Sequence, residues 1–547
     1  MSTAARPRAA RIPTSDPYGR PEAGSPAQRT ALRVVQAGAL LVVLAAAVYK
    51  VFELDRFFVP KELVLHLTAL VAGVLAVGAA KRAELTRVDL ALGGFLLLSG
   101  VSALLAQNPW VGVRSLAIGA SGMVLFWTAR SLARAGLGRP LLATLAVAVA
   151  LAAATSLMQT YGVKTDFFSI NRAPGGTLGN RNFVAHLCAF GLPLLFLAGL
   201  RAYRFAGLFL AGAGVAMLAA TLVLTRSRAA WLGAAAVLAV FLLGWLLVPP
   251  VRRQAKSWMR LMVLLAFAAG GGAASLAVPN KLRWNSDNPY AETARGVVNY
   301  REGSGAGRLV QYRNSLRMAL SNPLLGVGPG NWSVAYPRYA KAGDPSMDRR
   351  TGGMTSNPWP SSDWVAFLSE RGIPAFLLLV FAGFGLLVIA WRRMRGARDA
   401  DEGLLSLALA ATIAGTFVVG TFDAVLMLAL PSLLVWTALG ALSANEPGRW
   451  EVDVGAPKRI LGAVVVIAVL GAFAARSAGQ LAAMAIFANS GSRASLERAA
   501  TLDPGNYRVR LRLARSGPRA ERCPHALAAH ELYPEADAAA AAARRCR

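Results

Sequence analysis

Long apolar blocks separated by short polar connectors dominate the chain. Each block is roughly 18–22 residues long, which is the length of a helix that crosses a bilayer. About thirteen such blocks occur, at 32–49, 62–80, 88–106, 111–129, 140–158, 182–200, 205–225, 229–248, 259–278, 374–391, 403–421, 424–442 and 459–475. Buried helices of a large soluble protein are the alternative, but the short basic connectors favour membrane spans. The pattern predicts an all-α integral membrane protein with about 12–13 transmembrane helices.

The longest polar interruption is a loop at 279–373, between the ninth and tenth blocks. Its stretch "RLVQYRNSLRMALSNP" predicts an amphipathic helix, with Leu309, Tyr312, Leu316 and Leu320 on one face. The turn "NPLLGVGPGNW" ends this helix, because Pro and Gly favour compact loops. We therefore expect a large, partly helical loop outside the membrane.

The second polar region is the tail at 476–547. It contains "SRASLERAATLDPGNYRVRLRLARSG" and then "HALAAHELYPEADAAAAAARRC", both with Ala and Leu at helical spacing. The tail resembles a tetratricopeptide-type repeat pair, and plain helical hairpins fit it equally well. Because two units are few for independent stability, we expect the tail to pack on the membrane domain or on a protein partner.

Charge distribution sets the expected orientation. The net charge of +30 could suggest a nucleic-acid partner, but Lys and Arg concentrate in alternate connectors such as "KRAELTR", "VRRQAKSWMR" and "WRRMRGAR". The positive-inside rule then places the N-terminus in the cytoplasm and the C-terminus outside, with no nucleic acid bound. Residues 1–31 are rich in Pro, Ala, Arg and Ser, and we expect a disordered cytoplasmic tail and not a cleaved signal peptide. The membrane domain is then 32–475.

Cysteine positions fit this orientation. Cys523 and Cys546 both lie in the tail, which the charge rule places in an oxidising space. They could form a disulfide or remain two free thiols. Cys188 lies within a predicted span.

Sequence signatures for metal, nucleotide or redox chemistry are missing. The four histidines, His66, His186, His525 and His530, are scattered without metal-ligand spacing. No Walker sequence, nucleophile elbow or dinucleotide fingerprint occurs. The glycines of "GVGPGNW" follow a helix instead of a strand, so they indicate a phosphate loop only weakly. We expect no cofactor.

Arginines gather where spans meet the outer face. Arg226 and Arg228 share the short connector "LTRSRAAW", Arg181 precedes the sixth block, and Arg308 lies in the large loop. A guanidinium group is always charged and pairs bidentately with phosphate oxygens. Several arginines at one interface would suit a diphosphate whose lipid tail lies in the bilayer. Anchoring to anionic headgroups fits equally well.

Three motifs, in this order, resemble the O-antigen ligase and polymerase family: "GGTLGNRNFVAHLCAFGLPLLF", "LVLTRSRAAWLGAAAVLAVFLL" and "GRLVQYRNSLRMALSNPLLGVGPGNWSVAYPRY". The stretch "WVAFLSERGIPAFLLLV" is similar to the family's segment after the large loop. The resemblance covers roughly residues 30–475. It implies a GT-C-like glycosyltransferase of the bacterial inner membrane that takes a glycan from undecaprenyl diphosphate at the periplasmic face. Ligases pass this glycan to lipid A–core, whereas polymerases extend another lipid-linked repeat during lipopolysaccharide or other surface polysaccharide assembly.

The resemblance also implies roles for single residues. Arg228 matches the family's serine–arginine motif, and Arg308 matches the arginine that opens the loop helix. Both would hold the diphosphate, with Arg226 and Arg181 as further candidates, although relatives often have another residue at the position of Arg181. Undecaprenyl diphosphate is a good leaving group, so neither nucleotide nor metal is needed.

One departure concerns the residue that activates the acceptor. Ligases usually carry a histidine nine residues before the glutamate that matches Glu370, and here that position is Ser361. Three interpretations follow: Asp363 replaces the base, the protein is polymerase-like with different acceptor chemistry, or transferase activity has been lost. Asp363 and Glu370 are therefore candidate catalytic residues. A helix-terminal role for Asp363 and an arginine pair for Glu370 fit as well.

Two further function classes fit a polytopic, arginine-rich chain. A lipid-linked glycan flippase or transporter would more often show repeated halves, and we find no internal repeat. A catalytically inactive scaffold of polysaccharide assembly would lose all function if its tail were deleted. If the protein is an enzyme, we expect the loop at 279–373 to matter more for function than the tail.

Overall fold

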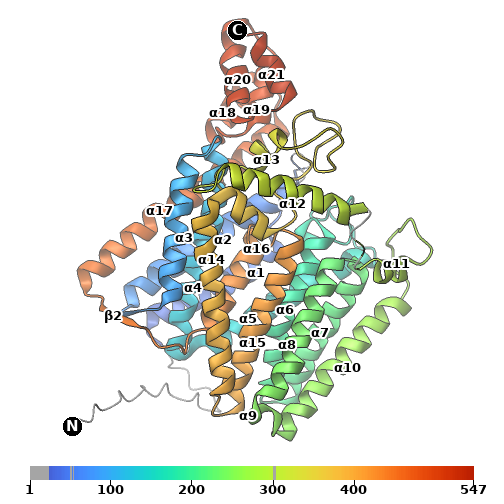
Figure 1. Ribbon diagram of the computed structural model, residues 1–547, viewed down its shortest axis with the longest axis vertical. Coiled ribbons are helices and arrows are strands. Elements are labelled where there is room, and N and C mark those ends of the chain that lie inside the picture. The colour runs from blue at the N-terminus through green and yellow to red at the C-terminus, as the bar shows by residue number, and fades with distance from the viewer. Residues whose placement is uncertain (1–23, 50–51, 53, 298, 300–302) are drawn as a thin grey trace.

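The computed structural model describes residues 24–49, 52, 54–297, 299 and 303–547. Long helices form a bundle, and the C-terminal tail stands on one end of it (Figure 1). The apolar blocks fall on α1 (Pro26–Leu44), α2 (Asp55–Ala79), α3 (Arg87–Leu104), α4 (Pro109–Leu132), α5 (Gly138–Thr160), α6 (Arg181–Leu200), α7 (Phe205–Thr225), α8 (Arg228–Leu247), α10 (Ala255–Ala277), α14 (Asp363–Arg395), α15 (Ala400–Phe422), α16 (Ala429–Leu442) and α17 (Ala456–Asn489).

These helices match the spans expected from the sequence. Within the described residues, 11 continuous segments are long and apolar enough to cross a membrane. One of them, Pro109–Thr160, contains both α4 and α5, joined by the short π-helix η1 (Ala133–Leu137). Helix α16 is a shorter apolar helix. The prediction of an all-α integral membrane protein is confirmed.

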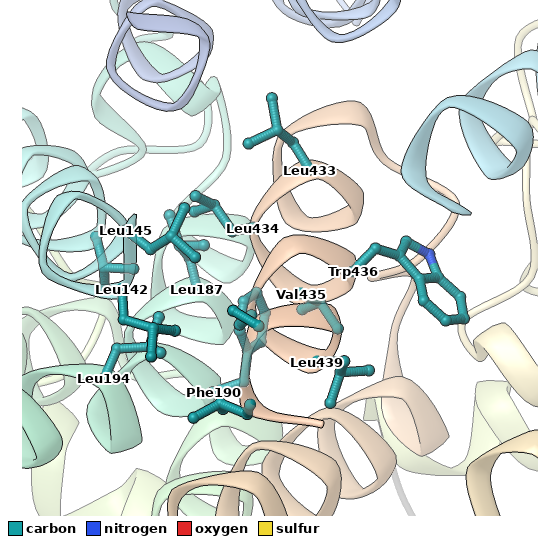
Figure 2. Packing of buried hydrophobic residues seen from close by; sticks show 14 of the residues in the cluster. Leu142, Leu145, Leu187, Phe190, Leu194, Leu433, Leu434, Val435, Trp436 and Leu439 are labelled. Carbon is teal, nitrogen blue, oxygen red and sulfur yellow. The ribbon is translucent and has the colours of Figure 1, made fainter. Parts of the chain in front are cut away.

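The core of the bundle lies around α6 and α16. Leu187 and Phe190 of α6 meet Leu434 of α16 and Leu145 of α5, all of them buried (Figure 2). Of the apolar window of each helix, 94% is buried in α6 but only 22% in α10 and α17. A helix that is apolar on all sides belongs in the centre, and one with an exposed apolar face borders lipid.

Connectors sort to two opposite ends of the bundle. At one end, β1 (Arg82–Leu85) pairs antiparallel with β2 (Trp450–Asp453), and α9 (Pro249–Arg252) also lies there (Figure 1). Arg201 of the connector after α6 pairs with Asp401 at the start of α15 (N–O distance 2.7 Å). The basic connectors that the charge pattern grouped together therefore do share one end.

The opposite end carries the irregular and short elements. The 3-10 helix η2 (Gly176–Leu178) precedes α6, and the large loop contains α11 (Pro289–Arg295), α12 (Gly303–Ser321), α13 (Trp332–Ala335) and η3 (Tyr336–Arg338). The large loop is thus partly helical, as expected. Helix α12 lies across the ends of the long helices (Figure 1).

The N-terminal boundary differs from the prediction. Of the tail expected to be disordered at 1–31, residues 1–23 lie outside the described residues, and α1 begins at Pro26. Ser25 and Gln28 form a capping box, and proline fits the first turn of a helix. These local signals start the helix before the apolar block does.

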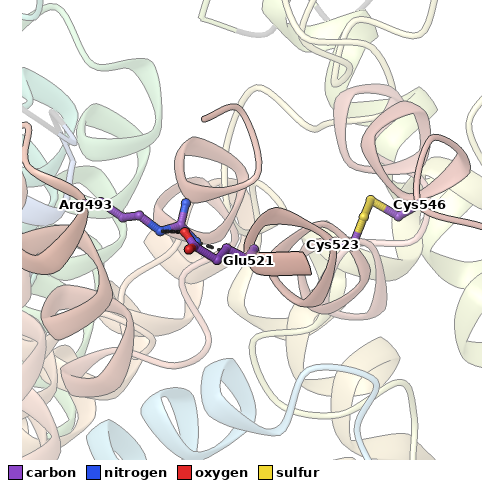
Figure 3. The surroundings of a disulfide bond; sticks show 4 residues. All are labelled: Arg493, Glu521, Cys523 and Cys546. Atoms are coloured by element: carbon purple, nitrogen blue, oxygen red, sulfur yellow. Dashed lines mark hydrogen bonds and ion pairs between the residues drawn. A yellow bond between two sulfur atoms is a disulfide. The ribbon is translucent and has the colours of Figure 1, made fainter. Parts of the chain in front are cut away.

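The tail begins inside a helix. Helix α17 continues past residue 475, and α18 (Arg493–Leu502), α19 (Tyr507–Leu513), α20 (Arg519–Leu532) and α21 (Asp537–Arg544) follow it. A disulfide joins Cys523 to Cys546, and Arg493 pairs with Glu521 at 2.9 Å (Figure 3). Cys188 is a buried free thiol. The tetratricopeptide-like assignment stays a prediction.

Candidate functional site

A tight turn presents Arg181 at the start of α6. Gly179 has a left-handed backbone (φ +75°), and a Cβ there would lie 2.3 Å from the ring of Phe57. Only glycine fits both constraints. The ammonium group of Lys61 donates to the carbonyl of Thr177 at 2.9 Å. The "GGTLGN" sequence thus fixes where α6 begins.

A second tight turn presents Arg226 and Arg228. Arg226 is left-handed (φ +55°) and ends α7, and Arg228 is the first residue of α8. A non-glycine residue in this region is uncommon and marks a constrained position. Because α7 stops and α8 starts within three residues, both arginines stay at the end of the bundle.

Arg181 and Arg226 share one aromatic partner. Each guanidinium carbon lies 4.8 Å from the ring centroid of Trp284, which is a cation–π distance. A carboxylate oxygen of Glu292 lies 4.0 Å from a guanidinium nitrogen of Arg226. The indole N–H of Trp284 is buried and has no hydrogen-bond partner among the described residues. This arrangement brings two positive charges to one ring, with the Glu292 carboxylate at the edge of ion-pair distance from Arg226.

The segment around α11 folds over the turn between α7 and α8. Arg226 donates to the hydroxyl of Thr293 at 2.8 Å. Arg228 donates to the carbonyls of Gly296 and Asn299, at 2.6 Å and 3.2 Å. Both arginines are half-buried. Backbone and hydroxyl acceptors therefore orient the two guanidinium groups.

His186 is the functional candidate that the sequence interpretation missed. It is 2% exposed, and its Nε2 lies 3.4 Å from the Ser227 hydroxyl and 3.9 Å from a carboxylate oxygen of Asp423. Its Nδ1 has no partner in the described part of the chain. Arg308 is near enough for its charge to act on this imidazole. A signal existed in the sequence, since His186 follows Arg181 by five residues on the same helix.

Helix α12 brings Arg308 to this site. The hydroxyl of Tyr312 donates to the carbonyls of Ser361 and Thr421, at 2.6 Å and 2.7 Å. These bonds fix α12 over the start of α14 and the end of α15. Arg308 is half-buried on this helix, one turn before Tyr312.

The predicted apolar face of α12 points away from the protein. Leu309, Leu316 and Leu320 are about half exposed or more, whereas Gln311 and Ser315 are buried. Tyr312, expected on the leucine face, is half-buried. The polar face is inside because it carries the hydrogen bonds that hold the loop together.

Asp363 lies at the first position of α14 and is fully buried. Its carboxylate accepts the backbone N–H groups of Val425 and Leu426, at 3.0 Å and 2.9 Å. These bonds tie the start of α14 to the segment before α16. The catalytic role predicted for Asp363 stays a prediction, and its contacts favour a structural role.

Glu370 is also fully buried. Its carboxylate pairs with Arg371 at 3.1 Å and accepts the backbone N–H of Trp332 at 3.3 Å. The arginine pair considered from the sequence is therefore present. A catalytic role for Glu370 likewise stays a prediction.

The glycines of "GVGPGNW" pack against a kink in α14. Gly372 interrupts this helix at φ +80°, where a Cβ would lie 2.3 Å from the carbonyl oxygen of Leu324. Gly326 is left-handed too, and a Cβ there would lie 2.3 Å from the carbonyl carbon of Glu370. The backbone N–H of Gly328 donates to the Glu370 carbonyl at 2.8 Å. The turn serves packing of the loop on the helix.

Metal-ligand geometry is missing from the described residues. No group of three or more His, Cys, Asp or Glu side chains there could hold a metal ion. The end of the bundle that carries α12 instead has an arginine-rich site with one buried histidine, His186. We call Arg181, Arg226, Arg228 and Arg308 the arginine site.

Residues 213–380 match the family model described as O-antigen ligase. The chain carries an O-antigen ligase domain. The predicted family resemblance is confirmed, and the match supports a membrane-embedded glycosyl-transferring enzyme. The matched segment contains Arg226, Arg228 and Arg308 but begins after Arg181. A comparison with curated proteins finds no match.

Proposed function

We propose that this protein transfers a glycan from undecaprenyl diphosphate at the end of the bundle that carries α12. The observation that carries the proposal is that Arg181 and Arg226 stack on Trp284 at the N-terminal end of α6. Arg228 follows two residues after Arg226, and the charge of Arg308 acts on His186 of α6. Guanidinium groups remain charged and match phosphate oxygens in bidentate pairs. The exposed leucines of α12 would lie against the lipid that carries the donor's polyprenyl chain.

The proposed reaction is a displacement at the anomeric carbon of the donor sugar. An acceptor hydroxyl oxygen forms the new glycosidic bond, and the bond from this carbon to the diphosphate oxygen breaks. The diphosphate leaves with the electron pair, and the arginines stabilise its growing charge. No nucleotide or metal is required for these steps.

We propose His186 as the group that takes the acceptor's proton. Its imidazole lies at the arginine site, and the carboxylate of Asp423 at 3.9 Å would stabilise the imidazolium. The Ser227 hydroxyl at 3.4 Å orients Nε2 and leaves Nδ1 without a partner among the described residues. His186 would thus supply from α6 the base that the large loop lacks.

Charge and cysteine chemistry support the orientation in the bacterial inner membrane. The basic connectors lie at the end opposite the arginine site, which the positive-inside rule assigns to the cytoplasm. The disulfide between Cys523 and Cys546 suits an oxidising periplasm. We therefore propose that the N-terminus is cytoplasmic and that the active site and the tail are periplasmic.

The acceptor is either lipid A–core or a second lipid-linked glycan. Purified protein reconstituted with lipid-linked oligosaccharide, with and without lipid A–core, separates the two. Capping of lipid A–core identifies a ligase, and chain growth without it identifies a polymerase. If neither product forms while the protein is folded, the glycosyltransferase proposal is wrong, and a flippase or an inactive scaffold takes its place.

A further inference from the structure

A cavity of about 360 Å³ lies between the membrane helices, the large loop and the C-terminal tail. Its volume falls within the range of small-molecule sites. Its walls come from the starts of α2, α4 and α16, the segment 354–359, α17 and the tail segment 503–508. Six aromatic side chains line it: Phe52, Phe58, Trp110, Trp359, Tyr507 and Tyr533.

The tail packs closely enough to be part of this cavity. A Cβ at Gly505 would lie 2.3 Å from the Cβ of Trp110, so glycine allows the tail backbone to touch α4. The rings of Tyr507 and Tyr533 lie 4.7 Å apart and both face the cavity. Burial raises the pKa of Tyr533 to about 12, so its hydroxyl keeps its proton as a donor.

Contacts with the large loop hold the tail in this position. Arg338 pairs with Glu535 at 2.8 Å, and the backbone N–H of Asp537 donates to the Gly352 carbonyl at 3.1 Å. The expectation that the tail packs on the membrane domain therefore agrees with these contacts.

Polar groups in the cavity are numerous and balanced in charge. Arg114 is held by Glu62 and Asp55, at 2.7 Å and 2.8 Å. Nε of Arg476 is buried without a hydrogen-bond partner among the described residues. Burial raises the pKa of Asp503, and the charge of Arg476 opposes that rise. Unlike the arginine site, this cavity does not favour an anion.

A cluster of three rings connects the cavity with the arginine site. Phe58 and Trp359, which line the cavity, pack on Phe183 of α6 at centroid distances of 5.7 Å and 6.3 Å. Phe183 lies between Arg181 and His186 on that helix. A ligand in the cavity therefore lies next to the part of α6 where transfer is proposed.

We propose that this cavity binds an uncharged saccharide segment of a transferred or accepting glycan, and that the tail supplies part of the site. Aromatic rings stack on the C–H faces of sugar rings, and carboxylate, guanidinium and hydroxyl groups bond to sugar hydroxyls. This inference rests on the proposed function and deepens it, since it makes the tail part of the substrate site.

Saccharide binding to the full chain in lipid nanodiscs tests the inference. One probe is the oligosaccharide released by mild acid from lipid-linked donor, and the other is deacylated lipopolysaccharide core oligosaccharide. Saturation-transfer NMR should detect at least one of them on the protein. Tyr507→Ala and Trp359→Ala should each weaken binding about tenfold, whereas Tyr507→Phe should retain most of it. Trp391→Ala is a matched control, because that tryptophan is 46% exposed and lies outside the cavity.

The two probes identify the source of the glycan, and binding of either one supports the inference. If neither probe binds, the inference is wrong. It is also wrong if a probe binds and both Tyr507→Ala and Trp359→Ala leave that binding unchanged. Tyr507 lies in the tail, outside the membrane spans, so protease resistance of the tail shows whether that variant stays docked.

The experiments distinguish failure of the saccharide-site inference from failure of the proposed function. Saccharide binding that depends on Tyr507, without transfer in the reconstituted system, overturns the function and supports the cavity. If transfer depends on Arg228 but not on Tyr507, and Tyr507→Ala leaves saccharide binding unchanged, only the inference of a saccharide site in the cavity is wrong.

Discussion

At the N-terminal end of α6, two arginines stack on one tryptophan, and a buried histidine faces an aspartate. Trp284 holds Arg181 and Arg226 at equal distances, so two like charges stay close to one ring. His186 has its Nε2 toward Ser227 and Asp423. In the proposed reaction, these side chains would supply the charge and the base that a sugar-diphosphate transfer requires.

Removing one diphosphate ligand should nearly abolish transfer. We expect Arg228→Ala and Arg308→Ala each to lower kcat/KM by roughly 10²-fold, because a charge-assisted hydrogen bond is worth about 1.5–3 kcal/mol. Turnover of lipid-linked donor by the reconstituted protein measures this loss. Arg317→Ala, an exposed arginine on the same helix as Arg308, should keep most activity. Wild-type activity in the Arg228→Ala, Arg308→Ala double variant would contradict the diphosphate assignment.

Substitution of His186 should lower the rate of the chemical step more than the affinity for the donor. General-base catalysis contributes about 10²–10⁴-fold, so His186→Ala should lower kcat by that order while the KM for the donor stays close to its original value. Steady-state kinetics with saturating acceptor separates the two constants. His525→Ala in the tail serves as the control. A His186→Ala variant with unchanged kcat would exclude this residue as the base.

At the scale of elements, α14 organises the large loop. The kink at Gly372 receives the glycine turn after α12, and the first residue of α14 binds the backbone before α16. Tyr312 then ties α12 to the same region. Asp363 and Glu370 belong to this framework, which sets the position of Arg308.

Asp363→Asn should therefore act mainly on stability. An amide adds a donor where the carboxylate accepted two backbone N–H groups, so we expect a loss of about 1–3 kcal/mol. Thermal unfolding in detergent gives the stability, and transfer per folded molecule gives the activity. Unchanged stability together with lost transfer would instead favour the catalytic role predicted from the sequence.

At the scale of the whole molecule, the loop and the tail lie at one end of the bundle (Figure 1). The connectors rich in Lys and Arg lie at the opposite end. The tail contacts the loop through Arg338 and Glu535 and covers the cavity beside α4. Membrane span, arginine site and tail thus form one continuous unit.

The disulfide provides a test of orientation in cells. We expect Cys523 and Cys546 to resist maleimide labelling until a reductant is added, because a periplasmic tail is oxidised. Mass spectrometry of the labelled peptides distinguishes them from buried Cys188. Labelling of both tail thiols before reduction would place the tail in a reducing compartment. In the Cys523→Ser variant, the tail should lose about 2–4 kcal/mol and become easier to proteolyse.

Local patterns account for what could be predicted. Each apolar block became a helix because about 20 apolar residues have one stable conformation in a bilayer, with their backbone groups satisfied internally. The short connector between α7 and α8 kept Arg226 and Arg228 at a membrane boundary, and the quoted motifs indicated the family. These features depend on residues close together in the chain.

The sequence by itself determined the class of protein, its spans, its charge asymmetry and the arginines at the ends of its spans. Only the tertiary structure decided that His186 lies beside Asp423 and that Asp363 accepts backbone N–H groups. It also decided that the tail forms part of the wall of a cavity beside α4. Those contacts join helices far apart in sequence. Bundle packing creates them, and no local periodicity records which helix ends will meet.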